Sequence, residues 1–402
     1  MGRFSFLLSM GSVTLVTIGT LGCYLLAMLI LGRSLSKESF GYVTLWVYAL
    51  NVLGAASLLG FPNAILRHYP RARLTGAQWG RVLPKLAFQS LIACSLGAWV
   101  FHLIYDLPQF ETLLLFLAAS TIGFTLLPIT ILQIFGRFAL AQGLYTLWRV
   151  GMLVGIGACL ALSLDLHVRQ VFIAIALSGF LQAVISVASV LRHPQGTESL
   201  PLRPLLPDAG VFASLFVAAM LLLRLDAFFI PKLLNFEALG TYSALSFLAL
   251  TGYGVISLAV GQVLNPKLAN REPVPLKKLT LLLALGGLLI GSVLALTSTW
   301  TIPFLFGDKY EGDFRLVVGL LSLVGVLQVL YAIPSSKVGI LGSKKLLRLY
   351  VPLSLSSLVV DALLLLWLVP KFGMRGAAGA AALTWFWRTG TAWLAARKLS
   401  PN

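Results

Sequence analysis

The amino-acid sequence predicts an all-α polytopic membrane protein of about 12 transmembrane helices. Of its 402 residues, 58% are hydrophobic and only 11% are charged, and apolar stretches of about twenty residues recur along the whole chain. A soluble protein could not bury so many long apolar stretches. Roughly 20 residues at about 1.5 Å rise per residue cross a hydrocarbon core of about 30 Å, so each stretch is long enough for one crossing.

Charged residues, Pro and Gly interrupt the apolar stretches, and each interruption predicts the end of one helix. The least marked interruption is "FGRF" at Phe135–Phe138. It separates two stretches that together exceed 50 residues, which is too long for one crossing, so we place a turn there. The expected spans cover residues 11–31, 42–66, 82–103, 112–135, 139–164, 170–191, 209–230, 239–264, 279–298, 316–334, 349–369 and 376–396.

The distribution of basic residues predicts how the helices are oriented. Of the 30 Lys and Arg residues, 19 lie at the chain ends, in the even-numbered loops or, for Lys85, in the first turn after such a loop. Another 8 lie in the odd-numbered loops, and 3 lie deeper inside expected spans. Cytoplasmic loops carry the excess of Lys and Arg in membrane proteins, so both termini are expected in the cytoplasm. The net charge of +17 then reflects loops that face anionic lipid, and nucleic acid is not an expected partner.

Several kinds of site are not indicated by the sequence. The longest connection, residues 192–208, has about 17 residues, so no soluble domain is expected between the helices. Cys23, Cys94 and Cys159 lie in apolar stretches without metal-ligand spacing, which is typical of small packing residues. The phosphate-binding pattern GxxxxGK[ST] does not occur in the sequence. We therefore expect no metal, no cofactor and no energy supply from ATP.

The sequence contains a weak internal repeat. "LGRSLSKESFGYV" at Leu31–Val43 aligns with "IPKLLNFEALGTY" at Ile230–Tyr242 at an offset of 199 residues. Both stretches follow the first helix of a set of six, and an even number of spans separates them, so the halves are expected to run parallel. The two halves are residues 1–200, with helices one to six, and residues 201–402, with helices seven to twelve. The aligned pairs are Arg33 and Lys232, Leu35 and Leu234, Glu38 and Glu237, and Gly41 and Gly240.

The two repeated junctions resemble those of a known family. "LGRSLSKESFGYVTLW" (Leu31–Trp46) and "RLDAFFIPKLLNFEALGTYSAL" (Arg224–Leu245) resemble the junctions between helices 1 and 2 and between helices 7 and 8 of bacterial polysaccharide flippases. These flippases are the Wzx-type members of the multidrug, oligosaccharidyl-lipid and polysaccharide exporter superfamily. Further similar pieces follow in the same order along nearly the whole chain: "LLGFPNAILRHY" (Leu58–Tyr69), "LQIFGRFALAQ" (Leu132–Gln142), "PFLFGDKYEG" (Pro303–Gly312) and "VPKFGMRGAAGAAALT" (Val369–Thr384).

The resemblance implies a membrane transporter, not an enzyme, in which two six-helix lobes surround a central cavity. A flippase of this family would carry an oligosaccharide linked to undecaprenyl pyrophosphate from the cytoplasmic to the outer leaflet of the bacterial inner membrane by alternating access. Its product would serve O-antigen, lipopolysaccharide or other surface polysaccharide biosynthesis. The implied partners are the lipid-linked glycan, membrane lipid and other membrane proteins of polysaccharide assembly.

Two other functions are compatible with the same composition. A cation-coupled small-molecule or multidrug antiporter of the same superfamily would share the fold, but its cavity would favour carboxylates that bind organic cations. With three arginines and two aspartates inside the expected spans, the sequence favours an anionic cargo. A membrane enzyme of glycan assembly usually needs a large outer loop that holds an acceptor, and the sequence contains no such loop.

The charged residues inside the expected spans are the candidate site residues. An ionised group near the bilayer centre costs about 2.5–3.5 kcal/mol on insertion scales, so such residues usually face protein or a water-filled cavity. Arg149 lies about ten residues into its span, or roughly 15 Å deep. We expect Arg149 and Arg224 to hold the pyrophosphate, because a guanidinium offers paired donors to phosphate oxygens and stays charged. The five residues are Arg149, Arg224, Asp226, Asp361 and Arg388.

Arg224 and Asp226 also have an alternative interpretation. Residues two apart on a regular helix point about 200° from each other, so the two side chains are not expected to satisfy one another. In the functional interpretation, Asp226 orients an arginine or carries a coupling proton. In the structural one, Arg224 lies about 10 Å from the outer end of its helix and extends to the lipid headgroups, while Asp226 makes a polar contact between helices.

Asp361 and Arg388 lie on the last two expected spans. They either form a structural ion pair or contact the substrate. Trp385 and Trp387 flank Arg388, and either ring is a candidate for stacking on the guanidinium or on a sugar.

Arg67 is the remaining candidate for substrate binding. Together with Arg71 and Arg73 it follows the second span on the expected cytoplasmic side, where a lipid-linked substrate would first arrive. The same cluster equally suits a topology anchor, because positive charge accumulates at the cytoplasmic ends of spans.

Overall fold

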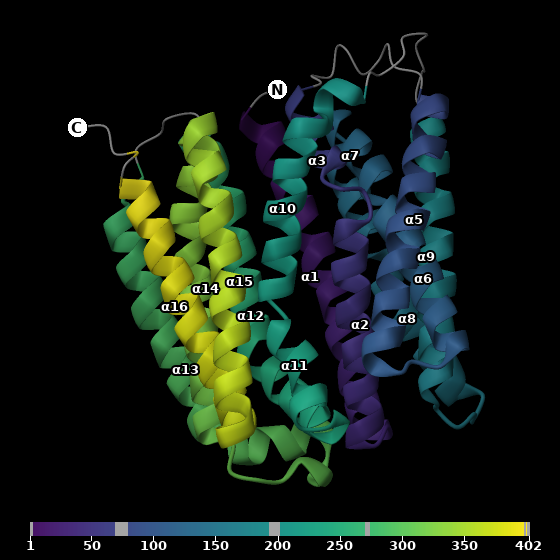
Figure 1. The fold of residues 1–402 in the computed structure, drawn as a ribbon, viewed down its shortest axis with the longest axis vertical. Helices are drawn as coiled ribbons and strands as arrows, with labels where there is room; N and C mark the ends of the chain where they lie inside the picture. Colours follow the sequence, from purple (N-terminus) through teal and green to yellow (C-terminus); the bar gives the residue numbers. More distant parts are fainter. Residues whose placement is uncertain (1–2, 69–78, 193–201, 270–273, 398, 400–402) are drawn as a thin grey trace. The chain divides into compact units, whose positions relative to one another are not determined.

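The computed structural model describes residues 3–68, 79–192, 202–269, 274–397 and 399, and all regular secondary structure in these residues is helical (Figure 1). The helices are α1 (Arg3–Ser34), α2 (Lys37–Ala56), α3 (Phe61–His68), α5 (Trp79–Tyr105), α6 (Gln109–Phe124), α7 (Leu126–Ile134), α8 (Phe138–Ala161), α9 (Val168–Leu191), α10 (Leu206–Leu222), α11 (Leu225–Leu233), α12 (Phe236–Ala269), α13 (Leu276–Phe306), α14 (Arg315–Leu341), α15 (Lys344–Phe372) and α16 (Met374–Arg397). Two single 3₁₀ turns, η1 (Arg203–Leu205) and η2 (Asp308–Tyr310), complete the set.

The all-α, multi-span prediction is confirmed. Eleven helical segments of the described chain are long and apolar enough to cross a membrane. The twelfth expected span, residues 376–396, is the helix α16, whose apolar content comes from Ala and Gly more than from Leu. Of its 24 residues, 13 are buried. Small residues let helix backbones approach closely, so α16 is a helix that packs mainly against protein.

The turn expected at Phe135–Phe138 is confirmed. The helix α7 ends at Ile134 and α8 begins at Phe138. Gly136 adopts a φ of 79°, a left-handed conformation that costs a glycine little because it has no Cβ. The glycine therefore allows the chain to reverse direction within three residues.

Two expected spans are interrupted, and here the prediction of continuous helices was wrong. The span 42–66 breaks between α2 and α3, and the span 209–230 breaks between α10 and α11. The expected span 112–135 is one membrane-crossing segment in which Thr125, between α6 and α7, keeps helical dihedrals of −62° and −19°. At the first break Gly60 has a φ of 74°, and a Cβ on it would collide with the carbonyl oxygen of Ala209 on α10. The break therefore packs closely against a distant helix, and the sequence marks it only by Gly60 and Pro62.

The chain forms two compact units. Unit 1 consists of Met1–Ile30 and Trp46–Met220, and unit 2 consists of Leu31–Leu45 and Leu221–Asn402. The end of the first expected span and the start of the second thus pack with the C-terminal part of the chain. The division into lobes at residue 200 remains a prediction.

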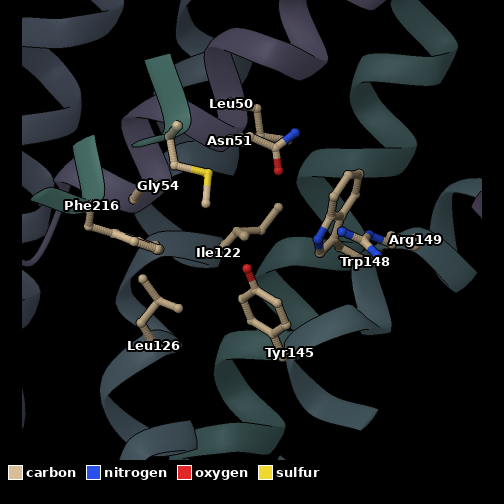
Figure 2. A pocket seen from close by; sticks show the side chains of 12 residues that line it. Leu50, Asn51, Gly54, Ile122, Leu126, Tyr145, Trp148, Arg149 and Phe216 are labelled. Carbon is tan, nitrogen blue, oxygen red and sulfur yellow. The ribbon is translucent and has the colours of Figure 1, made fainter. Parts of the chain in front are cut away.

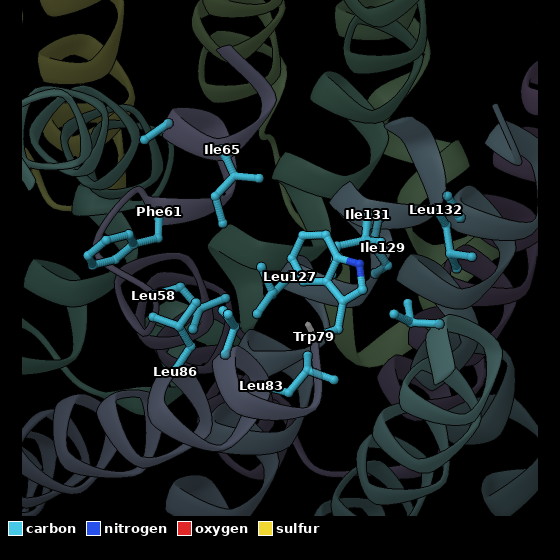
Figure 3. Close-up of a cluster of buried hydrophobic side chains, with 14 of the residues drawn as sticks. Leu58, Phe61, Ile65, Trp79, Leu83, Leu86, Leu127, Ile129, Ile131 and Leu132 are labelled. Carbon is cyan, nitrogen blue, oxygen red and sulfur yellow. The ribbon is translucent and has the colours of Figure 1, made fainter. Parts of the chain in front are cut away.

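The core of unit 1 lies where short helices meet long ones. Trp79, at the start of α5, is fully buried among aliphatic side chains of α3 and α7 (Figure 3). The helices α8 and α9, together with η1 and α10, each add one or two buried side chains to the same cluster. Close van der Waals packing stabilises helix association in a membrane, so this cluster fixes the short helices α3 and α7 in place.

The repeated glycines of the sequence lie against one another in unit 2. A Cβ on Gly41 would collide with the carbonyl oxygen of Phe236 and lie 2.7 Å from the amide nitrogen of Gly240. A Cβ on Gly240 would collide in the same way with the carbonyl oxygen of Lys37. Because Lys37 and Phe236 are also separated by 199 residues, the contact is locally two-fold symmetric. An ion pair of 3.4 Å between Lys37 Nζ and Glu237 Oε1 lies beside it.

Two basic side chains cap helix ends reciprocally in unit 2. Arg33, at the end of α1, donates from Nε to the carbonyl oxygen of Leu305 at 2.8 Å and also bonds that of Phe304, in the last turn of α13. Lys309, in η2, donates from Nζ to the carbonyl oxygens of Arg33, at 3.0 Å, and of Leu35. Burial and the nearby charge of Lys37 lower the pKa of Lys309. The last carbonyl oxygens of each helix thus accept hydrogen bonds from a basic side chain, where water would otherwise donate.

Replacing Gly41 with Ala is expected to destabilise the chain by about 1–3 kcal/mol, because the new methyl group has no room against the backbone of α12. Gly22→Ala on α1 is the matched control, since nothing lies within 4 Å of its added Cβ. Thermal unfolding of the purified protein measures both variants. A Tm for Gly41→Ala equal to that of Gly22→Ala would contradict the contact.

Candidate functional site

A small cavity in unit 1 brings polar side chains together inside the helices. It encloses about 40 Å³ of space for water-sized molecules, where one water needs roughly 10–15 Å³. A few waters fit, and a sugar ring does not. Figure 2 shows Asn51 of α2 and Tyr145 of α8 facing this space, with Arg149 and Trp148 side by side on one wall. The remaining lining is Leu50, Gly54, Ala55, Ile122, Gly123, Leu126, Phe216 and Met220.

Arg149 is held in this wall by aromatic rings. It is the twelfth of the 24 residues of α8, so it lies near the middle of a membrane-spanning helix. Its Cζ atom lies 5.4 Å from the ring centroid of Tyr24 and 5.6 Å from that of Trp148, within the range of attraction between a cation and a π system. Among the described residues no carboxylate lies within 4 Å of it, and its buried Nε has no hydrogen-bond partner. The positive charge is therefore stabilised without being neutralised.

Asp226 in unit 2 lies at the break between α10 and α11. Arg224 precedes α11 with a φ of −144°, so the two residues are not on one regular helix. The Asp226 carboxylate accepts hydrogen bonds from the Tyr242 hydroxyl at 2.5 Å and from the Ala227 amide at 2.8 Å. The charge of Arg224 also acts on it. On a regular helix, side chains two residues apart would point away from each other. The backbone at this break does not follow helical geometry, so that restriction does not apply to Arg224 and Asp226.

Asp361 on α15 is the second carboxylate of unit 2. Only 2% of the residue is exposed, and its Oδ1 accepts a hydrogen bond from the Thr384 hydroxyl of α16 at 2.9 Å. The helix α15 packs against α11, which carries Asp226.

Arg388 on α16 is surrounded by aromatic side chains. Its Cζ lies 4.6 Å from the ring centroid of Tyr331 and 5.0 Å from that of Trp385, and its Nη2 donates to the Tyr331 hydroxyl at 3.3 Å. Tyr331 in turn shares a hydrogen bond of 2.8 Å with the Tyr350 hydroxyl. Stacking of Trp385 on this guanidinium, one of the sequence-based expectations, is confirmed. Asp361 and Arg388 have separate partners, and the described contacts do not include an ion pair between them.

The six predicted site residues therefore fall into three groups. Arg149 lines the cavity of unit 1, whereas Arg224, Asp226, Asp361 and Arg388 lie in unit 2. Arg67 is in the last turn of α3, but its side chain, like Arg71 and Arg73, lies outside the described residues.

Sequence reasoning missed the side chains that hold these charges. The partners are Tyr24, Tyr242, Tyr331, Tyr350 and Thr384. Each lies in an apolar helix and contacts a residue of a different helix, so its spacing in the sequence does not reveal the contact. In the described part of the chain, no three His, Cys, Asp or Glu side chains come together as potential metal ligands.

No protein-family profile and no curated protein matches the sequence. Solved structures do share the fold. A MATE transporter in complex with MaD3S matches with a TM-score of 0.69 at 16% identity, over 97% of this chain and 95% of that one. A MOP superfamily transporter from Pyrococcus furiosus, described as having a binding pocket of reversed polarity, matches with a TM-score of 0.64 at 14% identity, over 98% and 95%. The lipid II flippase MurJ, in an inward closed conformation, matches with a TM-score of 0.61 at 14% identity, over 96% and 87%.

These likenesses establish the fold. The chain has the helical architecture of MATE and MOP superfamily transporters, and its identity to them is low enough that the match carries no further detail. The three proteins compared are two transporters and a flippase.

Replacing Asp361 with Asn and Arg388 with Leu together is expected to impair transport at least as much as the worse single change. The two side chains have separate partners, so removing one does not leave the other as an uncompensated charge. Transport by the two single variants and the double variant measures this. A double variant more active than either single variant would show that the two residues act as an ion pair.

Proposed function

We propose that the chain is a flippase that moves an oligosaccharide linked to undecaprenyl pyrophosphate from the cytoplasmic to the outer leaflet of the bacterial inner membrane. The observation that carries the proposal is the state of Arg149, a cation in the middle of α8 that borders a small cavity and has aromatic rings in place of a counter-charge. The proposed cargo is anionic at the pyrophosphate, and its glycan serves surface polysaccharide such as O-antigen or lipopolysaccharide.

A guanidinium in this state suits a pyrophosphate group. It remains charged at any physiological pH and offers donors in a planar fork that matches phosphate oxygens. Its Nε has no hydrogen-bond partner among the described residues and is free to donate to a ligand. In this proposal Arg149 contacts the phosphate end of the cargo, and the cavity of about 40 Å³ widens to admit it.

The two carboxylates of unit 2 suit a coupling cation. Asp226 and Asp361 lie on α11 and α15, which pack against each other, and the hydroxyls of Tyr242 and Thr384 donate to the two carboxylates. A proton or a sodium ion between the carboxylates would relieve their repulsion. In the proposed cycle, binding and release of this cation accompany the exchange of the two lobes, residues 1–200 and 201–402, between inward-open and outward-open states.

The fold supports the same proposal from a different direction. One protein of this fold is a lipid II flippase, so the architecture is compatible with moving a lipid-linked cargo. The proposed setting is the bacterial inner membrane with both termini in the cytoplasm. The proposed partners are the lipid-linked glycan, membrane lipid and other membrane proteins of polysaccharide assembly, and Arg67 is proposed to meet the substrate on the cytoplasmic side.

A cation-coupled small-molecule antiporter is the second candidate. The buried carboxylates Asp226 and Asp361 favour it, since organic cations bind to carboxylates, and transporters of this fold include MATE proteins. The two candidates differ in what a deletion strain would show. Loss of the flippase removes surface glycan and traps the lipid-linked intermediate on the cytoplasmic leaflet, whereas loss of the antiporter raises sensitivity to cationic compounds and leaves surface glycan unchanged.

Replacing Arg149 with Ala is expected to abolish surface glycan while the protein remains in the membrane, because the neutral side chain cannot hold a phosphate. Arg149→Lys should retain part of the activity, since a lysine keeps the charge but loses the planar fork. Surface polysaccharide and the amount of membrane-inserted protein are measured side by side in a complemented deletion strain. Normal glycan with Arg149→Ala would exclude the phosphate-binding role.

Replacing Asp361 with Asn is expected to remove the stimulation of transport by an imposed proton or sodium gradient. The neutral amide keeps the size of the side chain and its bond to Thr384 but no longer repels Asp226. The exposed Asp165 provides the control variant Asp165→Asn. Transport rates are compared with and without each gradient, and an Asp361→Asn variant that is stimulated like Asp165→Asn would rule out a coupling site there.

A further inference from the structure

A buried side-chain amide, that of Gln182, links two parts of the chain that line the unit 1 cavity. Gln182 on α9 is 0% exposed and uses both ends of its side chain. Its Oε1 accepts a hydrogen bond from the backbone amide of Trp148 on α8 at 3.0 Å, and its Nε2 donates to the Thr125 hydroxyl at 2.9 Å. A polar residue inside a membrane-spanning helix is costly unless fully bonded, and such residues usually serve a function.

The direction of the hydrogen bonds is fixed by chemistry. A backbone amide can only donate, so the carbonyl oxygen of Gln182 must face Trp148 and its amide group must face Thr125. The Thr125 hydroxyl then donates to the carbonyl oxygen of Ile122 at 2.6 Å. The result is one continuous chain of donors and acceptors that runs from α8 through α9 to α6.

Both ends of this chain lie at the candidate site. At one end, Trp148 is followed by Arg149, and both residues line the cavity. At the other end, Thr125 is the residue between α6 and α7, and its neighbours Ile122 and Leu126 line the cavity. Gln182 itself is not a lining residue. Gln182 connects α8, which carries Arg149, with the junction of α6 and α7, whose residues Ile122 and Leu126 also line the cavity.

Close helix packing brings the amide within reach of both partners. Gly179, one turn before Gln182, lies so near α6 that an added Cβ would be 2.8 Å from Ile122. Gly151 of α8 lies so near Ser178 of α9 that a Cβ there would collide. The helix α9 therefore approaches α6 and α8 at the same depth, where a side chain of fixed length spans both.

We infer that Gln182 is a positioning residue that fixes the position of Trp148 and Arg149 on α8 relative to Thr125, which lies between α6 and α7. Without its amide, the Trp148 backbone and the Thr125 hydroxyl each lose a buried partner, and the Arg149 wall is no longer tied to α6. The link to transport rests on the proposed function of Arg149, whereas the positioning itself does not.

The first test measures the position of Arg149 without any substrate. The purified full-length protein is treated with phenylglyoxal, an arginine reagent, and modification of Arg149 is followed over time by mass spectrometry. Gln182→Met keeps the length of the side chain and removes both hydrogen bonds, so the rate at Arg149 is expected to rise severalfold. Ser186→Ala is the matched control, because Ser186 is also 0% exposed, lies one turn further along α9 and has a hydroxyl without a partner.

Thr125→Val provides a second variant that removes only one end of the chain of hydrogen bonds. It keeps the shape of the threonine, so it remains informative if Gln182→Met does not fold. Its rate of Arg149 modification is expected to lie between those of the wild type and Gln182→Met. Thr125→Ser, which retains the hydroxyl, should restore the wild-type rate. Equal rates at Arg149 in the wild type, Thr125→Val and Ser186→Ala would overturn the inference.

A second test separates positioning from the proposed function. Binding of inorganic pyrophosphate to the purified protein is expected to weaken about tenfold in Gln182→Met, which corresponds to about 1.4 kcal/mol. If the wild type does not bind pyrophosphate at all, the proposed role of Arg149 fails, while the phenylglyoxal rates still decide the positioning. If the wild type and Gln182→Met bind equally well and react equally with phenylglyoxal, Gln182 has no positioning role.

Discussion

An ionised side chain in a membrane-spanning helix has to be stabilised by the protein, and this chain does so without direct neutralisation at its candidate site. Arg149 and Arg388 are each held by two aromatic rings, and Asp226 and Asp361 are held by hydroxyl groups and a backbone amide. Aromatic faces and hydroxyls lower the cost of burying a charge but leave most of that charge available. A bound anion or cation can therefore still gain from it, which a tight ion pair would prevent.

The backbone at the start of α11 follows from the same requirement. This helix begins at a break, where Asp226 accepts from the neighbouring Ala227 amide and from Tyr242 of α12. Irregular backbone is tolerated inside a membrane only where protein or a polar cavity satisfies its groups. At this break the carboxylate of Asp226 satisfies a backbone amide. At Thr125 the backbone keeps helical dihedrals, and the amide of Gln182 bonds the side-chain hydroxyl.

Composition and patterning were sufficient to predict the architecture, and less so the sites. Long apolar stretches reveal helices because the bilayer requires them, and the glycine in "FGRF" reveals a turn because few other residues adopt its conformation. The repeat aligned Gly41 with Gly240, and these two glycines lie in contact in the structure. In contrast, the break at Gly60 packs against α10, and the sequence does not say which distant helix lies alongside. The partners Tyr24, Tyr242 and Thr384 are set by helix packing, which a single sequence does not record.

We propose that this chain moves a lipid-linked pyrophosphate across a membrane, and one measurement tests this most directly. The purified chain is placed in vesicles that carry a fluorescent polyprenyl-pyrophosphate-linked disaccharide in both leaflets, and a membrane-impermeant quencher is added outside. If the account is right, the fluorescence of vesicles containing the protein falls to near zero, because lipid from the inner leaflet keeps reaching the outer one. If about half of the fluorescence persists, as in protein-free vesicles, the chain does not translocate this cargo and the account is contradicted.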